Sequence, residues 1–346
     1  MFKIAKARWP ELWQALAREG QLYLPALVDG KTDFTPWQKD TKVDLLTAVT
    51  AKSLKHLFFA QVEPLMDFQT SGKKVAVTPQ KLPEQPTIAF GVRACDLAGF
   101  AILDKVFLKE PVDTFYRARR EHCTLIGLAC GFPEETCFCH TFNIDAASPA
   151  GDVQTWLVWD NLYWESQTEK GRQLTAKLAA LFTEATAADK KLVQDQQAKI
   201  KETLRQLPLG QLRFSPELAK HEQEVFNSKV WEQLAATCLS CCGCTYVCPT
   251  CHCYDVRDNV GKDGQVQRFR CWDSCMNGDF TKMAHGNPRK GQLERFRQRY
   301  MHKLVYFPED YEGTFACVGC GRCLRICPVN LNIVKVAKAL EVDLHV

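Results

Sequence analysis

The first half of the chain alternates compact apolar runs with amphipathic stretches, which is typical of a mixed α/β domain. Residues 9–20, "WPELWQALAREG", carry apolar positions at helical spacing and end at a glycine. Residues 86–92, "PTIAFGV", form a short apolar run bounded by proline and glycine, which predicts a strand. Similar runs predict two more strands, at residues 73–79 and 123–130.

The apolar spacing becomes helical again directly after the run at residues 86–92. Residues 93–108, "RACDLAGFAILDKVFL", predict a helix that follows the strand at 86–92. This strand–turn–helix unit places Arg93, Cys95 and Asp96 at the carboxyl end of a strand. Open α/β sheets commonly bind ligands at that edge, so we expect a site there.

The pattern changes again towards the middle of the chain. Residues 154–164, "QTWLVWDNLYW", predict a strand or hairpin, and residues 167–209 predict one or two helices closed by "PLG". We place a domain junction at 210–230, beyond which lie 13 of the 18 cysteines. The expected fold is α+β, with a mixed α/β domain over residues 1–220 and a helical, ferredoxin-like domain over 221–346.

The composition of the chain limits which classes of protein it can belong to. The chain has 346 residues, of which 46% are hydrophobic and 24% charged, as in an ordinary soluble protein with a full core. Charges interrupt the first 20 residues where a signal peptide would be apolar, and no apolar run is long enough to span a bilayer. We therefore expect a cytoplasmic protein without a disulfide framework, in which 18 cysteines indicate metal or redox chemistry.

The formal net charge of +4 is mild, and basic residues gather mainly in residues 288–303. This run is typical of a solvated helix face or of a cover for buried negative clusters. A docking surface for an acidic partner is the alternative. Nucleic acid is not expected as a partner, because no nucleic-acid motif accompanies the basic run.

One cysteine motif occurs twice, with spacing x2-x2-x3 and a proline after the fourth cysteine. This is the run of bacterial ferredoxins, in which three thiolates hold one [4Fe–4S] cluster and the fourth ligates the neighbouring cluster. Structural zinc sites also use pairs of cysteines separated by two residues, but they do not require the x2-x2-x3 spacing to occur twice. The spacing therefore predicts two [4Fe–4S] clusters, one on Cys238, Cys241, Cys244 and Cys327, and the other on Cys317, Cys320, Cys323 and Cys248.

A second group of cysteines lies in the first half of the chain, at positions 95, 123, 130, 137 and 139. Cys137 and Cys139 lie close to Cys130 in "LACGFPEETCFC", and Cys95 lies on a separate turn. Four soft ligands suit a further iron–sulfur cluster or a zinc ion. Free cysteines are also good small buried residues, so the spacing alone leaves both interpretations open.

Taken together, "FGVRACDLAG", "LACGFPEETCFCH", "CPTCHCYDV", "RCWDSC" and "CVGCGRCLRICPVNL" resemble a known family. They are similar to the β subunit of cytoplasmic sulfhydrogenases and, equally, to the iron–sulfur subunit of anaerobic sulfite reductase and its relatives. The resemblance covers most of the chain from about residue 85 onwards. It implies a non-catalytic electron carrier between a flavoprotein subunit that oxidises NAD(P)H and a module that reduces protons, sulfur, sulfite or a disulfide.

The resemblance also implies roles for particular residues. Family members carry an Arg-x-Cys-Asp motif and a Cys-x6-Cys-x-Cys motif, which implies a third [4Fe–4S] cluster. Arg93 would balance the cluster charge and Asp96 would cap the following helix, whereas the simpler alternative for both is a local salt bridge. Cys123 matches no characteristic position. The implied ligands are Cys95, Cys130, Cys137 and Cys139.

Three more cysteines recur in the family, at positions 251, 253 and 275. They would form a site with a non-cysteine ligand, or a fourth cluster with Cys271, or they are buried packing near the clusters. Cys242 replaces a glycine that is usual after the second ligand, and we expect it to bind nothing.

These observations favour an iron–sulfur electron-transfer subunit of an oxidoreductase complex over an enzyme with hydride chemistry. No G-x-G-x-x-G sequence opens a helix after a strand. The expected partners are a flavoprotein subunit that binds FAD and NAD(P)H, and a hydrogenase, sulfite reductase or heterodisulfide reductase-type subunit. Two alternatives remain, a stand-alone reductase with its substrate at the N-terminal cluster and a zinc-bearing scaffold.

Overall fold

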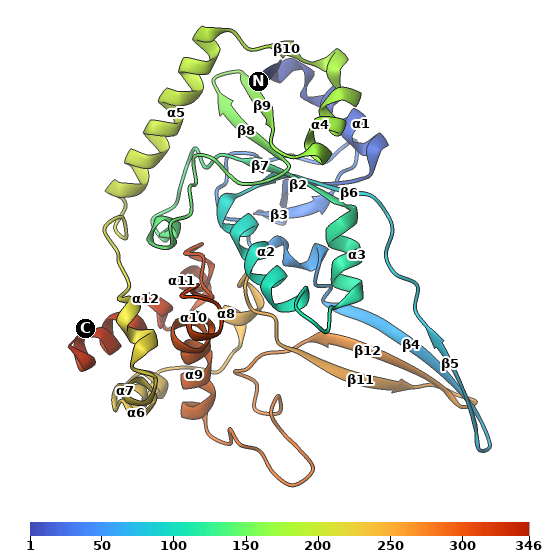
Figure 1. Cartoon of the computed structure of the whole chain (residues 1–346), viewed down its shortest axis with the longest axis vertical. Coiled ribbons are helices and arrows are strands. Elements are labelled where there is room, and N and C mark those ends of the chain that lie inside the picture. The colour runs from blue at the N-terminus through green and yellow to red at the C-terminus, as the bar shows by residue number, and fades with distance from the viewer. Residues whose placement is uncertain (346) are drawn as a thin grey trace.

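A computed structural model describes residues 1–345 and shows two sheets and a helical region (Figure 1). The larger sheet has eight strands, of which four neighbours in the middle are parallel and the outer ones are antiparallel. Its strands in spatial order are β10 (Thr183–Glu184), β1 (Phe2–Ala5), β9 (Asn161–Ser166), β8 (Val153–Val158), β7 (Cys123–Leu128), β6 (Thr87–Val92), β2 (Gln21–Val28) and β3 (Lys31–Pro36).

Helices cover both faces of this sheet. α1 (Trp9–Glu19) and α4 (Glu169–Lys177) contribute Leu12, Leu16 and Leu174 to one apolar core, beneath the strands. The opposite face packs against helices from three separate parts of the chain, namely α2 (Ala94–Phe107), α3 (Thr114–His122) and α5 (Ala187–Gln206). The predicted elements at 9–20, 86–92, 93–108, 123–130, 154–164 and 167–209 are confirmed, the fifth as the hairpin β8–β9.

A second, four-stranded antiparallel sheet extends away from the body as an arm (Figure 1). At its base the buried Arg270 donates to Glu63 at 2.6 Å, and Trp272 stacks on Phe59 with ring centroids 5.8 Å apart. The strand predicted at 73–79 lies here and not in the large sheet. The arm joins strands from both sides of the expected junction, in the order β11 (Tyr254–Val260), β12 (Gln265–Trp272), β4 (Val62–Ser71) and β5 (Lys74–Pro79).

The remaining helices form a separate region with its own apolar core (Figure 1). A continuous helical segment runs through this core, from α9 (Gln292–Met301) through a π-helical turn at His302–Tyr306 to α10 (Phe307–Asp310). The others are α6 (Glu222–Asn227), α7 (Val230–Ala236), α8 (Gly243–Tyr246), α11 (Arg322–Ile326) and α12 (Ile333–Leu344). The two ferredoxin-type motifs supply α8 and α11, so the expected α+β fold with a helical cysteine-rich region is confirmed.

Candidate metal centres

Four cysteines surround a first cavity beside the two short motif helices, which lie next to each other. Three come from the first motif and the fourth, Cys327, follows α11 of the second. Among the three, Cys241 is exposed, and Leu239 next to this group has 63% of its surface exposed. We call this the outer cavity, lined by Cys238, Cys241, Cys244 and Cys327.

A second cavity is lined by the other four motif cysteines. Here Cys248, the last cysteine of the first motif, joins three cysteines of the second motif. The crossing of the fourth cysteines thus occurs in both directions, as the spacing requires for two clusters. We call this the central cavity, lined by Cys248, Cys317, Cys320 and Cys323.

The third cavity forms where the large sheet meets the helical region. Cys95 lies in the first turn of α2, directly after β6, and Cys130 follows β7. Because β6 and β7 are neighbouring parallel strands, their carboxyl ends bring these two thiols to one edge of the sheet. The loop after β7 adds the other two. We call this the inner cavity, lined by Cys95, Cys130, Cys137 and Cys139.

The three cavities lie in a row, because neighbours share lining residues. Arg299 lines the outer and central cavities, and Cys320 lines the central and inner cavities. Two glycines of the second motif make the latter contact close: the backbone N–H of Phe138 donates to the carbonyl of Gly319 at 2.9 Å. A Cβ at Gly319, whose φ is +59°, would lie 2.4 Å from the Phe138 carbonyl oxygen.

The donors around these cavities fit thiolate-ligated iron–sulfur clusters. Backbone N–H groups point at sulfur from Ser240 to Cys238 at 3.4 Å and from Leu331 to Cys327 at 3.2 Å. Such N–H···S contacts orient thiolate ligands and tune cluster potential. The N–H of Glu134 makes the same contact with the inner-cavity sulfur of Cys137, at 3.4 Å.

Burial sets the protonation of the thiols in the inner and central cavities. Burial raises the pKa of Cys95 well above its ordinary value and that of Cys137 to about 12. Burial also raises the pKa of Cys323 to about 12. These thiols therefore hold their protons at neutral pH in the free protein, and iron binding would release them.

A cover for buried negative clusters was one of the two structural interpretations predicted for the basic run, but the sequence singled out no individual cation. Arg299 and Lys303 belong to the basic run at 288–303, but both are buried and face the cavities instead of solvent. The signal lies in their spacing: with Phe296 and Tyr300 they occupy the buried i, i+3, i+4, i+7 stripe of one helix. Lys303 Nζ lies 3.5 Å from Cys248 Sγ.

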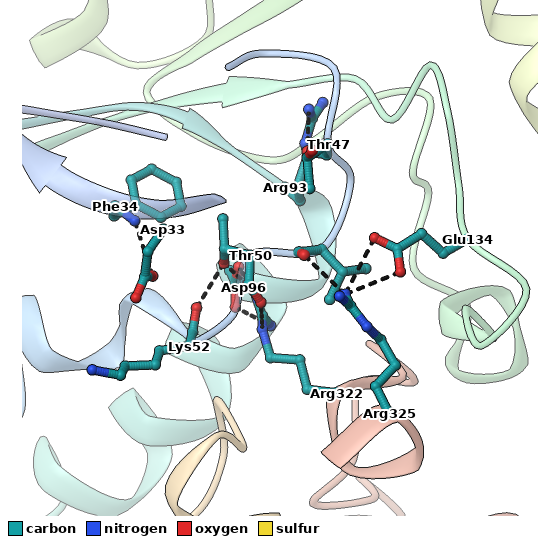
Figure 2. Close-up of polar contacts among 11 residues, drawn as sticks. Asp33, Phe34, Thr47, Thr50, Lys52, Arg93, Asp96, Glu134, Arg322 and Arg325 are labelled. Atoms are coloured by element: carbon teal, nitrogen blue, oxygen red, sulfur yellow. Dashed lines mark hydrogen bonds and ion pairs between the residues drawn. The ribbon is translucent and has the colours of Figure 1, made fainter. Parts of the chain in front are cut away.

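Of the predicted cofactor-binding pair, Arg93 lines the inner cavity, whereas Asp96 does not and instead binds Arg322 (Figure 2). Arg93 lines the cavity and donates to backbone carbonyls, including those of Ala129 at 2.8 Å and Thr47 at 3.0 Å. The capping role predicted for Asp96 is wrong, since α2 has no side-chain cap. Asp96 lies within the first turn, where the buried Arg322 binds both of its carboxylate oxygens, at 2.8 and 2.7 Å.

This Asp96–Arg322 ion pair joins α2 to α11, and so the sheet to the second cysteine motif. Arg322 also donates to the carbonyl of Thr50 at 3.0 Å (Figure 2). Burial opposes its charge, but Asp96 and the nearby thiols outweigh burial and hold the pKa of Arg322 well above its ordinary value. Removal of one partner from such a buried pair typically costs about 3–5 kcal/mol.

The structure places the remaining cysteines in two groups. Cys251 hydrogen-bonds to Cys248 and lowers its pKa, while a hydrogen bond from Cys275 lowers the pKa of Cys253 to about 7. Cys251, Cys253 and Cys275 therefore lie close to the central cavity, which Cys251 contacts through Cys248. The buried Lys55 donates to the Cys251 carbonyl at 2.8 Å. The others lie apart from this group: Cys123 in the core under α3, Cys242 at the start of α8, and Cys271 on β12 beside Arg257 and Asp255.

Within residues 1–345, no group of three or more His, Cys, Asp or Glu side chains is arranged to hold a single metal ion. The predicted ligands instead line three cavities in sets of four, and Cys242 also lines the outer cavity, as Cys320 also lines the inner one. No helix in the same range is both long and apolar enough to cross a membrane.

Two comparisons agree with this geometry. The 4Fe–4S dicluster domain family matches residues 237–331, which contain both motifs and the segment between them. The chain is also 32% identical over 339 residues to sulfhydrogenase 2 subunit beta of Pyrococcus furiosus, with 96% of each chain covered. The chain belongs to the sulfhydrogenase β-subunit family. No solved structure matches it.

Membership of the sulfhydrogenase β-subunit family extends over the large sheet as well as the cysteine-rich region, because the similarity covers nearly the whole chain. The dicluster match supports [4Fe–4S] clusters as the cofactor at the outer and central cavities, whose cysteines lie within the matched residues. The assignment of individual ligands stays a prediction.

Proposed function

We propose that this protein is the iron–sulfur subunit of a cytoplasmic oxidoreductase complex of anaerobic metabolism. It would relay electrons between a flavoprotein subunit that oxidises NAD(P)H and a hydrogenase or related reductase subunit. The relative's name, a sulfhydrogenase β subunit, supports a hydrogenase-type assembly. The observation that carries the proposal is the row of three thiol-lined cavities, since a relay needs closely spaced cofactor sites.

The ligand sets follow the cavities. The outer and central cavities would each hold one [4Fe–4S] cluster on the four cysteines that line them, and the inner cavity would hold a third. When bound, each cluster would accept and donate one electron at a time. The protein would hold the clusters in order and supply N–H donors to the sulfurs of their cysteine ligands.

The ends of the row suggest where partners exchange electrons. Cys241 is exposed at the outer cavity, and the apolar Leu239 and Ile326 flank that cavity with large exposed fractions. Residues of the loop after β7, including Phe132 and Pro133, separate the inner cavity from a wide surface groove beneath α5. One exposed end, and one buried end that shares Pro133 with a surface groove, support a relay between two different partners.

The inner cavity supports a relay more than it supports a stand-alone reductase with substrate at that site. Its four thiols supply a full set of ligands, which leaves no iron position open for a substrate. The thiols Cys251, Cys253 and Cys275 would form a further site only with a fourth ligand, and Cys271 lies away from them.

Cluster reduction by NAD(P)H in the intact complex, compared with the isolated chain, tests the proposal. The visible absorbance of the clusters should bleach rapidly in the complex, because the flavoprotein supplies the electrons. The isolated chain should not respond to NAD(P)H, although dithionite should still reduce it. Equal rates of reduction with and without the flavoprotein would show that the chain itself oxidises NAD(P)H, which contradicts the proposal.

A further inference from the structure

Arg299 differs from the other buried arginines of the chain in its lack of an acceptor. Its side chain is 3% exposed, and within residues 1–345 neither Nε nor Nη1 has a hydrogen-bond partner. By contrast, Arg93 donates to carbonyls, Arg270 pairs with Glu63, and Arg322 pairs with Asp96. A buried, unpaired guanidinium is costly, so a negative group must lie beside it in the working protein.

The position of Arg299 indicates what that negative group is. Its side chain is part of the wall of both the outer and the central cavity. The guanidinium also lies over the ring of Tyr300, with its carbon 4.4 Å from the ring centroid.

We propose that Arg299 is a positioning residue for electron transfer, a single cation that serves both ferredoxin-motif clusters and raises the reduction potential of each. This inference rests on the proposed function, because it requires clusters in the outer and central cavities. Four thiolates make each cluster site negative, and reduction adds a further negative charge. A nearby cation therefore stabilises the reduced state more than the oxidised state.

Lys303, one helical turn later, provides an internal comparison. Its Nζ donates to Thr250 Oγ1 and to the carbonyl of Ala316, both at 2.8 Å, and lies near Cys248 of the central cavity. Lys303 lines the central cavity but not the outer one. Its charge should therefore act mainly on one potential, whereas that of Arg299 should act on two.

Redox titration of the full-length, iron-loaded protein, followed by EPR, separates these effects. In Arg299→Gln both ferredoxin-motif potentials should fall, while in Lys303→Gln only the central one should fall. Arg299→Lys keeps the charge and should restore both potentials. Arg297→Gln is the matched control: Arg297 lies on the same helix but stacks on Phe226, 3.6 Å from its ring centroid, so both potentials should stay unchanged.

Full iron content with wild-type potentials in Arg299→Gln would overturn the proposal, as would a shift in only one cluster. If Arg299→Gln fails to retain iron, Arg299→Lys and Arg299→Met decide. Iron loading by the lysine variant but not by the methionine variant supports a charge role. Iron loss in both, or wild-type potentials in the methionine variant, overturns it. Fewer than about eight irons in the wild-type chain would instead contradict the proposed function itself.

Discussion

At the residue scale, the cysteines fall into those that line the three cavities and those that lie elsewhere. Spacing predicted the eight motif cysteines, because the fourth cysteine of each run must reach the neighbouring site. Spacing left open whether the four inner-cavity cysteines bind a cluster or only pack in the core, and family resemblance favoured the cluster. The basic run was predicted to form a solvated face or to cover buried negative clusters, and the buried Arg299 and Lys303 fit the second alternative.

The inner cavity provides a direct contrast between a lining cysteine and a packing cysteine. Cys130→Ser should remove about four irons per chain, because serine replaces one of four thiolate ligands. Cys123→Ser should keep all iron, since Cys123 is equally buried but lies in the core under α3. Iron analysis of both variants after anaerobic purification checks this, and equal iron in the two would remove Cys130 from the ligand set.

Two neighbouring histidines should make the fold sensitive to acid. Burial lowers the pKa of His252 to about 4 and, with His252 and Lys303 nearby, that of His302 to about 3. Above pH 6.5 both rings are neutral whether the chain is folded or not. As the pH falls from about 6.5 towards these lower values, the unfolded chain binds protons that the folded chain refuses, so stability is lost.

His302→Phe should reduce this acid sensitivity by on the order of 2 kcal/mol at pH 4. Urea unfolding between pH 7 and pH 4 measures it, with the exposed His285→Phe as the control. An identical pH dependence in wild type and His302→Phe would show that folding does not lower the pKa of His302.

At the element scale, most local structure followed from periodicity. The helices α1, α2 and α5 and the strands β6 to β9 lie where their apolar spacing placed them. β5 was predicted as a strand, but its sheet was not, because β5 pairs with β4, and β4 pairs with β12 about 200 residues later. All six residues of β5 are exposed, so the strand has no buried face from which its place in a sheet could be predicted.

Contact between the second cysteine motif and the Cys137–Cys139 loop should depend on Gly319. Gly319→Ala places a Cβ against the Phe138 carbonyl in addition to straining a backbone whose φ is +59°. Gly313→Ala is the matched control, because its φ is +78° but nothing lies within 4 Å of the added Cβ. The control should cost about 1–2 kcal/mol from backbone strain alone.

Gly319→Ala should cost clearly more than this, and it should also release iron from the central and inner cavities. Thermal unfolding and iron content of the two variants test the prediction. Similar melting temperatures and full iron in both would mean that the loop and the motif do not need their close contact.

At the scale of the whole molecule, the order of the cavities is what the sequence could not predict. The motif spacing predicts which cysteines share a cluster, but not that the second motif packs against a loop about 180 residues earlier. That packing makes Cys320 a common wall of the central and inner cavities, and the Asp96–Arg322 pair holds the two regions together. The predicted boundary near residue 220 stays a prediction.

The number of irons per full-length chain, measured together with acid-labile sulfide after anaerobic purification, tests the row of three clusters most directly. We expect about 12 irons, four for each cavity. About 16 irons would add a site at Cys251, Cys253 and Cys275 and would still agree with clusters in all three cavities. About eight irons or fewer would leave the inner cavity without a cluster and contradict a relay that runs through all three.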